Sequence, residues 1–224
     1  MQHARNKAQG FTLVEIAIVL VIIGLLLGGV LKGQEMIENS RIKAVVNDMN
    51  GVSAAYNAYF DRYRALPGDE AAATMTARGW AGTLGGDGNG VLAIAPADAF
   101  LNTGEQASMW RALRASGLAT GDPTLPAAPA SLPRAGNGGL LAVALGTYGM
   151  AGPSVCVSGL THKQAAGVDV AVDGALPANN IGNNAGSVRG ANNAVAPLAP
   201  AAAVAGGAAY NENAATLWTL CRRM

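Results

Sequence analysis

Hydrophobic residues form one long run near the N-terminus. Between Phe11 and Leu31 only Thr12 and Glu15 are polar. As a helix this run would be about 31 Å long, enough to cross the hydrocarbon core of a bilayer. A secretory signal peptide has a shorter apolar core and a small-residue cleavage site, whereas this run continues into polar helical sequence. We therefore predict a membrane-spanning helix rather than a signal peptide or a buried helix of a soluble domain.

Beyond the run, the hydrophobic positions become periodic. They recur in steps of three or four residues, which is typical of an amphipathic helix with one buried face. These positions are Ile42, Val45, Met49, Val52, Tyr56, Tyr59 and Tyr63. The first proline after the run is Pro67, and Pro67-Gly68 is a helix stop signal. We predict one helix from near Thr12 to near Arg64, about 80 Å long.

Two shorter helices are predicted after residue 67. Asp69 is a candidate N-cap for a helix that ends at Gly79. Thr103 and Gln106 form a candidate capping box for a second helix, and Gly117 marks its C-terminal end.

The last third of the chain contains strand-like apolar runs. They lie at residues 140–149, 154–159, 168–172 and 216–221. The low-complexity stretch 176–209, rich in Ala, Asn, Gly and Pro, is interpreted as a long surface loop. A long helix, a variable connection and a small antiparallel sheet together predict an α+β fold.

The charge pattern orients the chain. Arg5 and Lys7 precede the apolar run, and no acid accompanies them in the first ten residues. The positive-inside rule then leaves the N-terminus in the cytoplasm and sends the rest of the chain outward. The whole chain has a net charge of +1 without a cluster of Lys and Arg, so we expect no nucleic-acid partner.

Glu15 is the unusual residue of the apolar run. A charged side chain at the centre of a spanning helix costs about 2.5–3.5 kcal/mol and usually has a partner. Glu15 lies only one turn inside the run, where this cost is smaller. Its carboxylate either reaches the headgroups or pairs with a cation of another chain.

The stretch GFTLVEIAIVLVIIGLLL, which begins at Gly10, resembles the N-terminus of type IV prepilins and type II secretion pseudopilins. In that family a short basic leader ends in Gly and is followed by Phe, Thr or Ser, Leu, an aliphatic residue and Glu. The resemblance implies that a prepilin peptidase cleaves between Gly10 and Phe11 and methylates the new Phe11 amine. It also implies that Glu15 pairs with the Phe11 amine of a neighbouring subunit. Gln9 departs from the pattern, because Lys or Arg is common there.

The resemblance further implies an organisation and a set of partners. The expected parts are a leader at 1–10, a filament-core helix at 11–31, an amphipathic helix at 32–66 and a pilin-like head at 67–224. The precursor would lie in the inner membrane, within the lipid bilayer. It would then join a homo-oligomeric or mixed pilin filament, extracellular or periplasmic, through the inner-membrane machinery of a pilus or of type II secretion. A minor pilin that acts as an adhesin or in DNA uptake, or a type II pseudopilin, is the alternative.

The two cysteines lie far beyond the apolar run. In an exported domain a pair such as Cys156 and Cys221 usually forms a disulfide, and two buried free thiols are the alternative. A bridge that closes a loop of about 65 residues contributes about 4 kcal/mol to stability on the chain-entropy model.

One candidate metal site is present in the sequence GGDGNG. Asp87 and Asn89 are spaced as in the first half of a calcium loop, with Asp69 as a distant candidate ligand. The third ligand position is Val91, and the later Glu of a calcium loop is missing. Asn89-Gly90 by itself predicts a tight turn, which we favour over a calcium site.

Little in the sequence indicates catalysis. His3 lies in the leader and His162 stands alone, and neither a nucleophile elbow nor a zinc-ligand spacing is visible. We therefore expect a structural protein rather than an enzyme, and no cofactor other than the candidate calcium ion.

Overall fold

The computed structural model describes residues 12–80, 85–174, 186–193, 197, 199–203 and 216–224. The chain divides into two compact units, residues 1–40 and 41–224. The boundary between these units falls within the long first helix, between Ser40 and Arg41.

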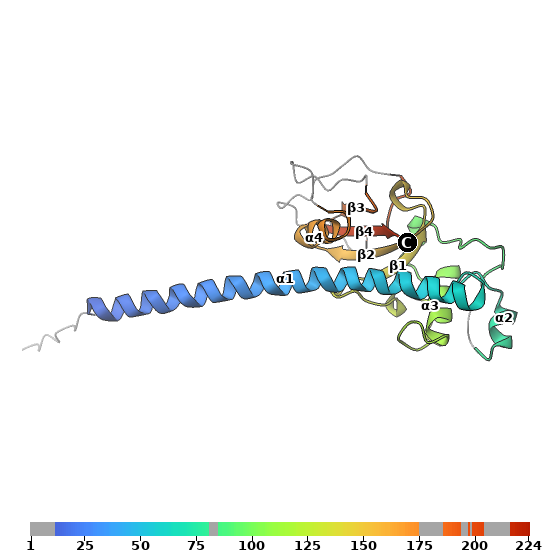
Figure 1. Ribbon diagram of the computed structural model, residues 1–224, viewed down its shortest axis with the longest axis horizontal. Helices are drawn as coiled ribbons and strands as arrows, with labels where there is room; N and C mark the ends of the chain where they lie inside the picture. Colours follow the sequence, from blue (N-terminus) through green and yellow to red (C-terminus); the bar gives the residue numbers. More distant parts are fainter. Residues whose placement is uncertain (1–11, 81–84, 175–185, 194–196, 198, 204–215) are drawn as a thin grey trace, which may run out of the picture. The chain divides into compact units, whose positions relative to one another are not determined.

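Helix α1 spans Leu13–Tyr63 and confirms the prediction of one long helix (Figure 1). In the first unit, its large apolar side chains from Leu13 to Leu31 are exposed. The most apolar window of 18 residues has a mean hydropathy of 2.8, so this part is long and apolar enough to cross a membrane. Exposed side chains of this kind are stable in lipid but not in water.

The second part of α1 buries the predicted face. Its buried side chains are Val45, Met49, Val52, Ala55, Tyr56 and Tyr59. Ile42 and Tyr63, at the two ends of the same face, are half-buried. The helix ends when Arg64 adopts a left-handed conformation with φ 54°, before the chain reaches Pro67.

A four-stranded antiparallel sheet completes the α+β, pilin-like architecture. Its strands are β1 Leu141–Leu145, β2 Pro153–Leu160, β3 Val188–Asn193 and β4 Leu217–Arg223, in the spatial order β1-β2-β4-β3. Strand β4 is last in the chain yet lies between β2 and β3 (Figure 1). The predicted strand runs at 154–159 and 216–221 are therefore confirmed. Of the run at 140–149, residues 141–145 are strand, whereas 147–149 form a 3₁₀ turn.

The fourth strand prediction, at 168–172, is wrong. These residues belong to helix α4, His162–Asp173. Thr161 and Gln164 form a capping box at its start, since the Gln164 amide donates to Thr161 Oγ1 and the Thr161 amide donates to Gln164 Oε1. A capped start fixes the helical path of the first turn, and this local signal overrides the β propensity of the valines.

The actual edge strand, β3, lies inside the stretch 176–209 that we interpreted as one loop. The Asp173 carboxylate receives the start of this strand, because it accepts hydrogen bonds from the Ser187 hydroxyl and from the Val188 amide (2.8 Å). Gly190 suits β3, since a Cβ atom there would lie 2.8 Å from the main-chain oxygen of Thr219 as well as 2.2 Å from Leu220 Cδ2. Residues 176–185, 194–196, 198 and 204–209 of the expected loop lie outside the described part of the chain.

The shorter helices differ from the predictions at their caps. Helix α2 spans Ala72–Ala77 and its N-cap is Ala71, so Asp69 does not cap it. Helix α3 spans Gly104–Ala115, and its N-cap Thr103 makes no side-chain capping bond. The 3₁₀ turns are η1 Pro96–Asp98, η2 Pro129–Ser131 and η3 Thr147–Gly149.

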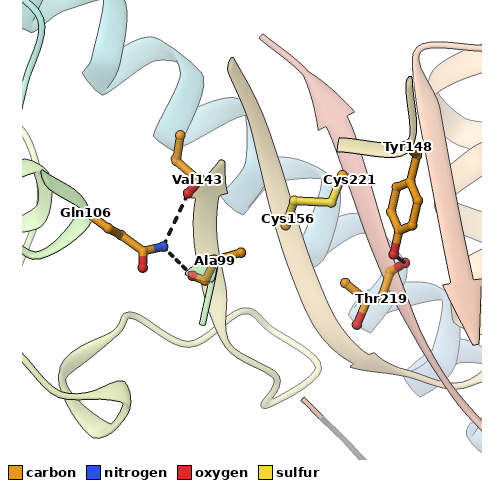
Figure 2. Close-up of a disulfide and its surroundings, with 7 residues drawn as sticks. All are labelled: Ala99, Gln106, Val143, Tyr148, Cys156, Thr219 and Cys221. Atoms are coloured by element: carbon orange, nitrogen blue, oxygen red, sulfur yellow. Dashed lines mark hydrogen bonds between the residues drawn. A yellow bond between two sulfur atoms is a disulfide. The ribbon is translucent and has the colours of Figure 1, made fainter. Parts of the chain in front are cut away.

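Gln106 serves a tertiary role in place of the predicted capping box. Its Oε1 accepts from the Asn102 amide (3.0 Å), while its Nε2 donates to the carbonyl oxygens of Ala99 and Val143 (Figure 2). Gln106 thus ties α3 to β1 and satisfies a carbonyl on the outer edge of the sheet. The predicted end of α3 is confirmed, because Gly117 has φ 77° and the Leu118 amide donates to Leu113 O (2.9 Å).

Candidate functional site

Two features of the chain bear on function: the start of α1 and the polar clusters of the head. Gly10 and Phe11, the predicted cleavage and methylation residues, lie outside the described residues. The structure describes the chain from Thr12, and therefore includes Glu15.

Glu15 forms a reciprocal pair with Thr12. Its Oε2 accepts hydrogen bonds from the Thr12 amide and from Thr12 Oγ1, each at 2.8 Å. In return, the Glu15 amide donates to Thr12 Oγ1 at 3.3 Å. This is a capping box at the first turn of α1, and it satisfies main-chain donors that an apolar surrounding would leave without a partner. The spacing T-x-x-E indicates this role of Glu15, which was not among the two predicted from the sequence.

The structure contains the predicted disulfide. Cys156 in β2 and Cys221 in β4 are directly opposite each other, with their Cα atoms 4.0 Å apart, and both are fully buried (Figure 2). The bridge joins residues that are 65 positions apart and fixes the last strand of the chain in the centre of the sheet.

The GGDGNG stretch bends at residues 89–91, and Asp69 holds this bend. Asp69 Oδ1 accepts from the Asn89 amide (3.0 Å) and Oδ2 from the Gly90 amide (2.9 Å). Asn89 is used within the turn, since its Nδ2 donates to Asp87 Oδ2 (2.7 Å) and its Oδ1 accepts from the Val91 amide (2.7 Å). Both ends of the Asn89 side chain therefore have partners inside the loop.

A different set of three residues could hold a cation. One carboxylate oxygen from each of Asp69, Asp87 and Glu105 lies within 4.8 Å of the others. Oxygen ligands of this kind suit calcium. Glu105, on the first turn of α3, was not a candidate in the sequence, because no loop spacing connects it to Asp87. The structure thus unites Asp69 with Asp87, and it adds Glu105 in place of Asn89.

The arginines of α3 organise the connection that follows this helix. Arg111 Nη2 donates to Leu125 O (2.6 Å), and Arg114 Nη2 donates to Ser131 O (2.7 Å). Burial lowers the pKa of Arg114. Arg111 and Arg114 therefore hold the proline-rich connection after α3 through its main-chain carbonyl groups.

Comparison with known proteins gives one match, which covers residues 5–31. The matching family model is described as the prokaryotic N-terminal methylation motif. No curated protein and no solved structure matches the chain. The motif and the apolar N-terminal helix support a membrane-anchored precursor, and the motif implies a substrate of prepilin peptidase. Residues 5–31 therefore carry the N-terminal methylation motif that is the signature of type IV pilins and pseudopilins.

Proposed function

We propose that this protein is a structural subunit of a type IV pilus-like filament. The observation that carries the proposal is the methylation motif at residues 5–31, which includes a helical segment whose large apolar side chains are exposed from Leu13 to Leu31. Such a surface is stable in a bilayer, and it is equally suited to packing against identical helices in a filament core.

The proposed sequence of events follows the parts of the chain. The precursor is held in the inner membrane by residues 11–31 and loses its leader, residues 1–10, by cleavage between Gly10 and Phe11. The new Phe11 amine is methylated, and residues 11–31 then pack in the filament core, while the amphipathic part, 32–66, continues into the head, 67–224. The filament is extracellular or periplasmic.

Glu15 sets the register of assembly in this proposal. Cleavage creates a cation at Phe11, four residues from the acid. An acid and an amine that meet in an apolar bundle remove two unpaired charges, and this favours the one register in which they meet. The contact with Thr12 complements this role, because it holds the carboxylate at the end of the helix where a neighbouring amine can approach.

The alternatives differ in what the head does. A minor pilin would bind a surface or take up DNA, and salt-dependent DNA binding by the purified full-length protein would favour the DNA-uptake role. A type II pseudopilin would form a short periplasmic filament. Some pseudopilins bind calcium in a loop of the head, so a rise in melting temperature on addition of calcium, lost in Asp87→Asn, would favour that class.

The decisive experiment is intact mass analysis and N-terminal sequencing of the protein from its native membrane or filament fraction, without reduction. We expect a chain that begins at N-methylated Phe11. A chain that still begins at Met1 or Gln2 would contradict the proposal and indicate an ordinary signal-anchored protein.

A further inference from the structure

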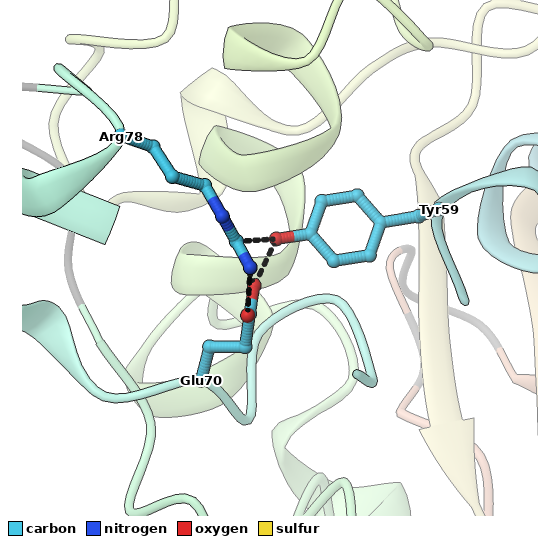
Figure 3. A network of polar contacts seen from close by, with 3 residues as sticks. All are labelled: Tyr59, Glu70 and Arg78. Carbon is cyan, nitrogen blue, oxygen red and sulfur yellow. Dashed lines mark hydrogen bonds and ion pairs between the residues drawn. The ribbon is translucent and has the colours of Figure 1, made fainter. Parts of the chain in front are cut away.

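A second polar network lies at the far end of α1, away from the methylation motif. Arg78 and Glu70 form a bidentate ion pair, with Nη1–Oε2 at 2.5 Å and Nη2–Oε1 at 2.6 Å (Figure 3). Tyr59 on α1 donates its hydroxyl hydrogen to Glu70 Oε2 and accepts from Arg78 Nη1 at 3.4 Å. The side chain of Glu70 is only 8% exposed, so the pair is largely shielded from water.

Aromatic rings surround the Arg78 guanidinium. Its central carbon lies 4.5 Å from the centroid of the Tyr63 ring and 5.3 Å from that of Trp80. The Tyr63 and Trp80 rings meet edge to face, with centroids 5.4 Å apart. These cation–π contacts add to the ion pair and join the residues after α1 to the last turn of that helix.

The segment that contains α2 buries few side chains. From Ala71 to Ala77 only Met75 is buried, and the other side chains are exposed. Local opening is easiest where few apolar side chains are buried. Glycines with positive φ lie on both sides of the segment, at Gly68 (98°) and Gly79 (82°), where the backbone can change direction.

We propose that residues 69–80 form a strap across the end of α1, held to that helix by the contacts of Glu70 and Arg78 with Tyr59 and Tyr63, which opens as a unit while the sheet remains folded. Opening uncovers Tyr59 and Tyr63 and withdraws Met75. The sheet is independent of this step, since the buried Cys156–Cys221 bridge holds its two central strands together.

The strap is coupled to the turn at Asn89-Gly90. Glu70 O accepts from the Gly86 amide (2.8 Å), and the Asp69 carboxylate accepts from the amides of Asn89 and Gly90. Asp69 and Glu70 are adjacent, so Glu70 cannot leave α1 without moving the carboxylate that holds the turn. Opening of the strap therefore also releases the turn and separates Asp69 from Asp87.

Hydrogen exchange measured by mass spectrometry on the full-length protein in detergent micelles tests this inference. In Arg78→Gln we expect the amides of 69–80, and those of Asn89 and Gly90, to exchange about 10- to 100-fold faster, because Glu70 loses its ion-pair partner. Amides of β2 and β4 should keep their wild-type rates. Arg78→Lys retains the charge but not the bidentate contact, so its exchange rates in 69–80 should lie between those of the wild type and Arg78→Gln.

Arg62→Gln is the matched control. The Arg62 guanidinium also lies over the Tyr63 ring, at 5.3 Å, and its loss should leave the exchange of the strap unchanged. Unchanged exchange of 69–80 in Arg78→Gln would overturn the proposal. Equal acceleration throughout the head would also overturn it, because the pair would then be part of the global core.

Discussion

Thr12 and Glu15 form hydrogen bonds in both directions at the first turn of α1. The Glu15 carboxylate accepts hydrogen bonds from the Thr12 amide and the Thr12 hydroxyl, and the Thr12 hydroxyl accepts one from the Glu15 amide. The acid of the apolar run is therefore already partnered within its own chain. This relationship separates two roles of Glu15, the capping of its own helix and the proposed pairing with a neighbouring amine.

Substitution of Glu15 distinguishes these roles. We expect Glu15→Ala to insert into the membrane and to be cleaved, but to assemble poorly. Glu15→Gln keeps an acceptor for the Thr12 amide but has no charge. It should therefore preserve the capping of the first turn of α1 without supporting assembly. Cleavage and filament yield are measured by immunoblot of membrane and sheared fractions. Glu35→Ala, which removes an exposed acid paired with Lys32, is the control. Normal filaments from Glu15→Ala would refute the pairing.

Thr12 is expected to act through the cap. Thr12→Val removes the hydroxyl, and the first turn of α1 should lose about 1 kcal/mol, as in other N-cap substitutions. Amide exchange of Glu15 and Ile16 in micelles should accelerate about fivefold for that free-energy change. Thr12→Ser retains the hydroxyl and should behave as the wild type. Equal exchange in the Val and Ser variants would show that the hydroxyl contributes nothing.

The disulfide should stabilise the head strongly. We expect Cys156→Ser/Cys221→Ser to lose about 4 kcal/mol and to melt about 10 °C lower, because the bridge closes a long loop around the last strand. Thermal unfolding followed by circular dichroism measures this. Reduction of the wild type should produce the same shift, whereas the reductant should leave the melting temperature of the double variant unchanged. A variant with the wild-type melting temperature would contradict the expectation.

Asp69 should contribute more to the stability of the head than an exposed acid such as Asp98. Asp69→Ala leaves the Gly90 amide without its acceptor and leaves Asp87 Oδ1 as the acceptor of the Asn89 amide. We expect a loss of about 1–3 kcal/mol in the free energy of unfolding. Urea titration of the protein in micelles gives this value. Asp98→Ala, at an exposed acid of η1, should change it by less than about 0.5 kcal/mol. Similar losses in both variants would argue against a specific role for Asp69.

Two buried tyrosines predict loss of stability at high pH. Burial raises the pKa of Tyr148, and burial together with Glu70 raises that of Tyr59. Tyrosine in the unfolded chain has a pKa of about 10. Because the folded-state pKa values are raised, the associated stability is fully present below that pH and is lost as the pH rises above it. Melting temperatures measured from pH 8 to pH 11 should fall most steeply above pH 10. Tyr59→Phe should show a smaller fall, and an equal fall would contradict the assignment.

The sequence by itself determined the elements whose signal is local and periodic. The apolar run and the three-to-four-residue spacing from Ile42 to Tyr63 define a single helix, because a helical face needs no information from distant residues. The two cysteines allow only one intrachain pairing. The motif around Gly10 carries the family signature, since it is read as a linear sequence.

Only the tertiary structure decided the polar contacts of the head and the edge of the sheet. Strand β3 has little apolar character, and it forms because β4 offers a free edge and Asp173 receives its first residues. Glu105 joins Asp69 and Asp87 because α3 brings its first turn to the loop. Glu70 finds Arg78 and Tyr59 only after α1 has ended and the chain has turned back. Such partners are chosen by packing between distant segments, a relationship that no local spacing records.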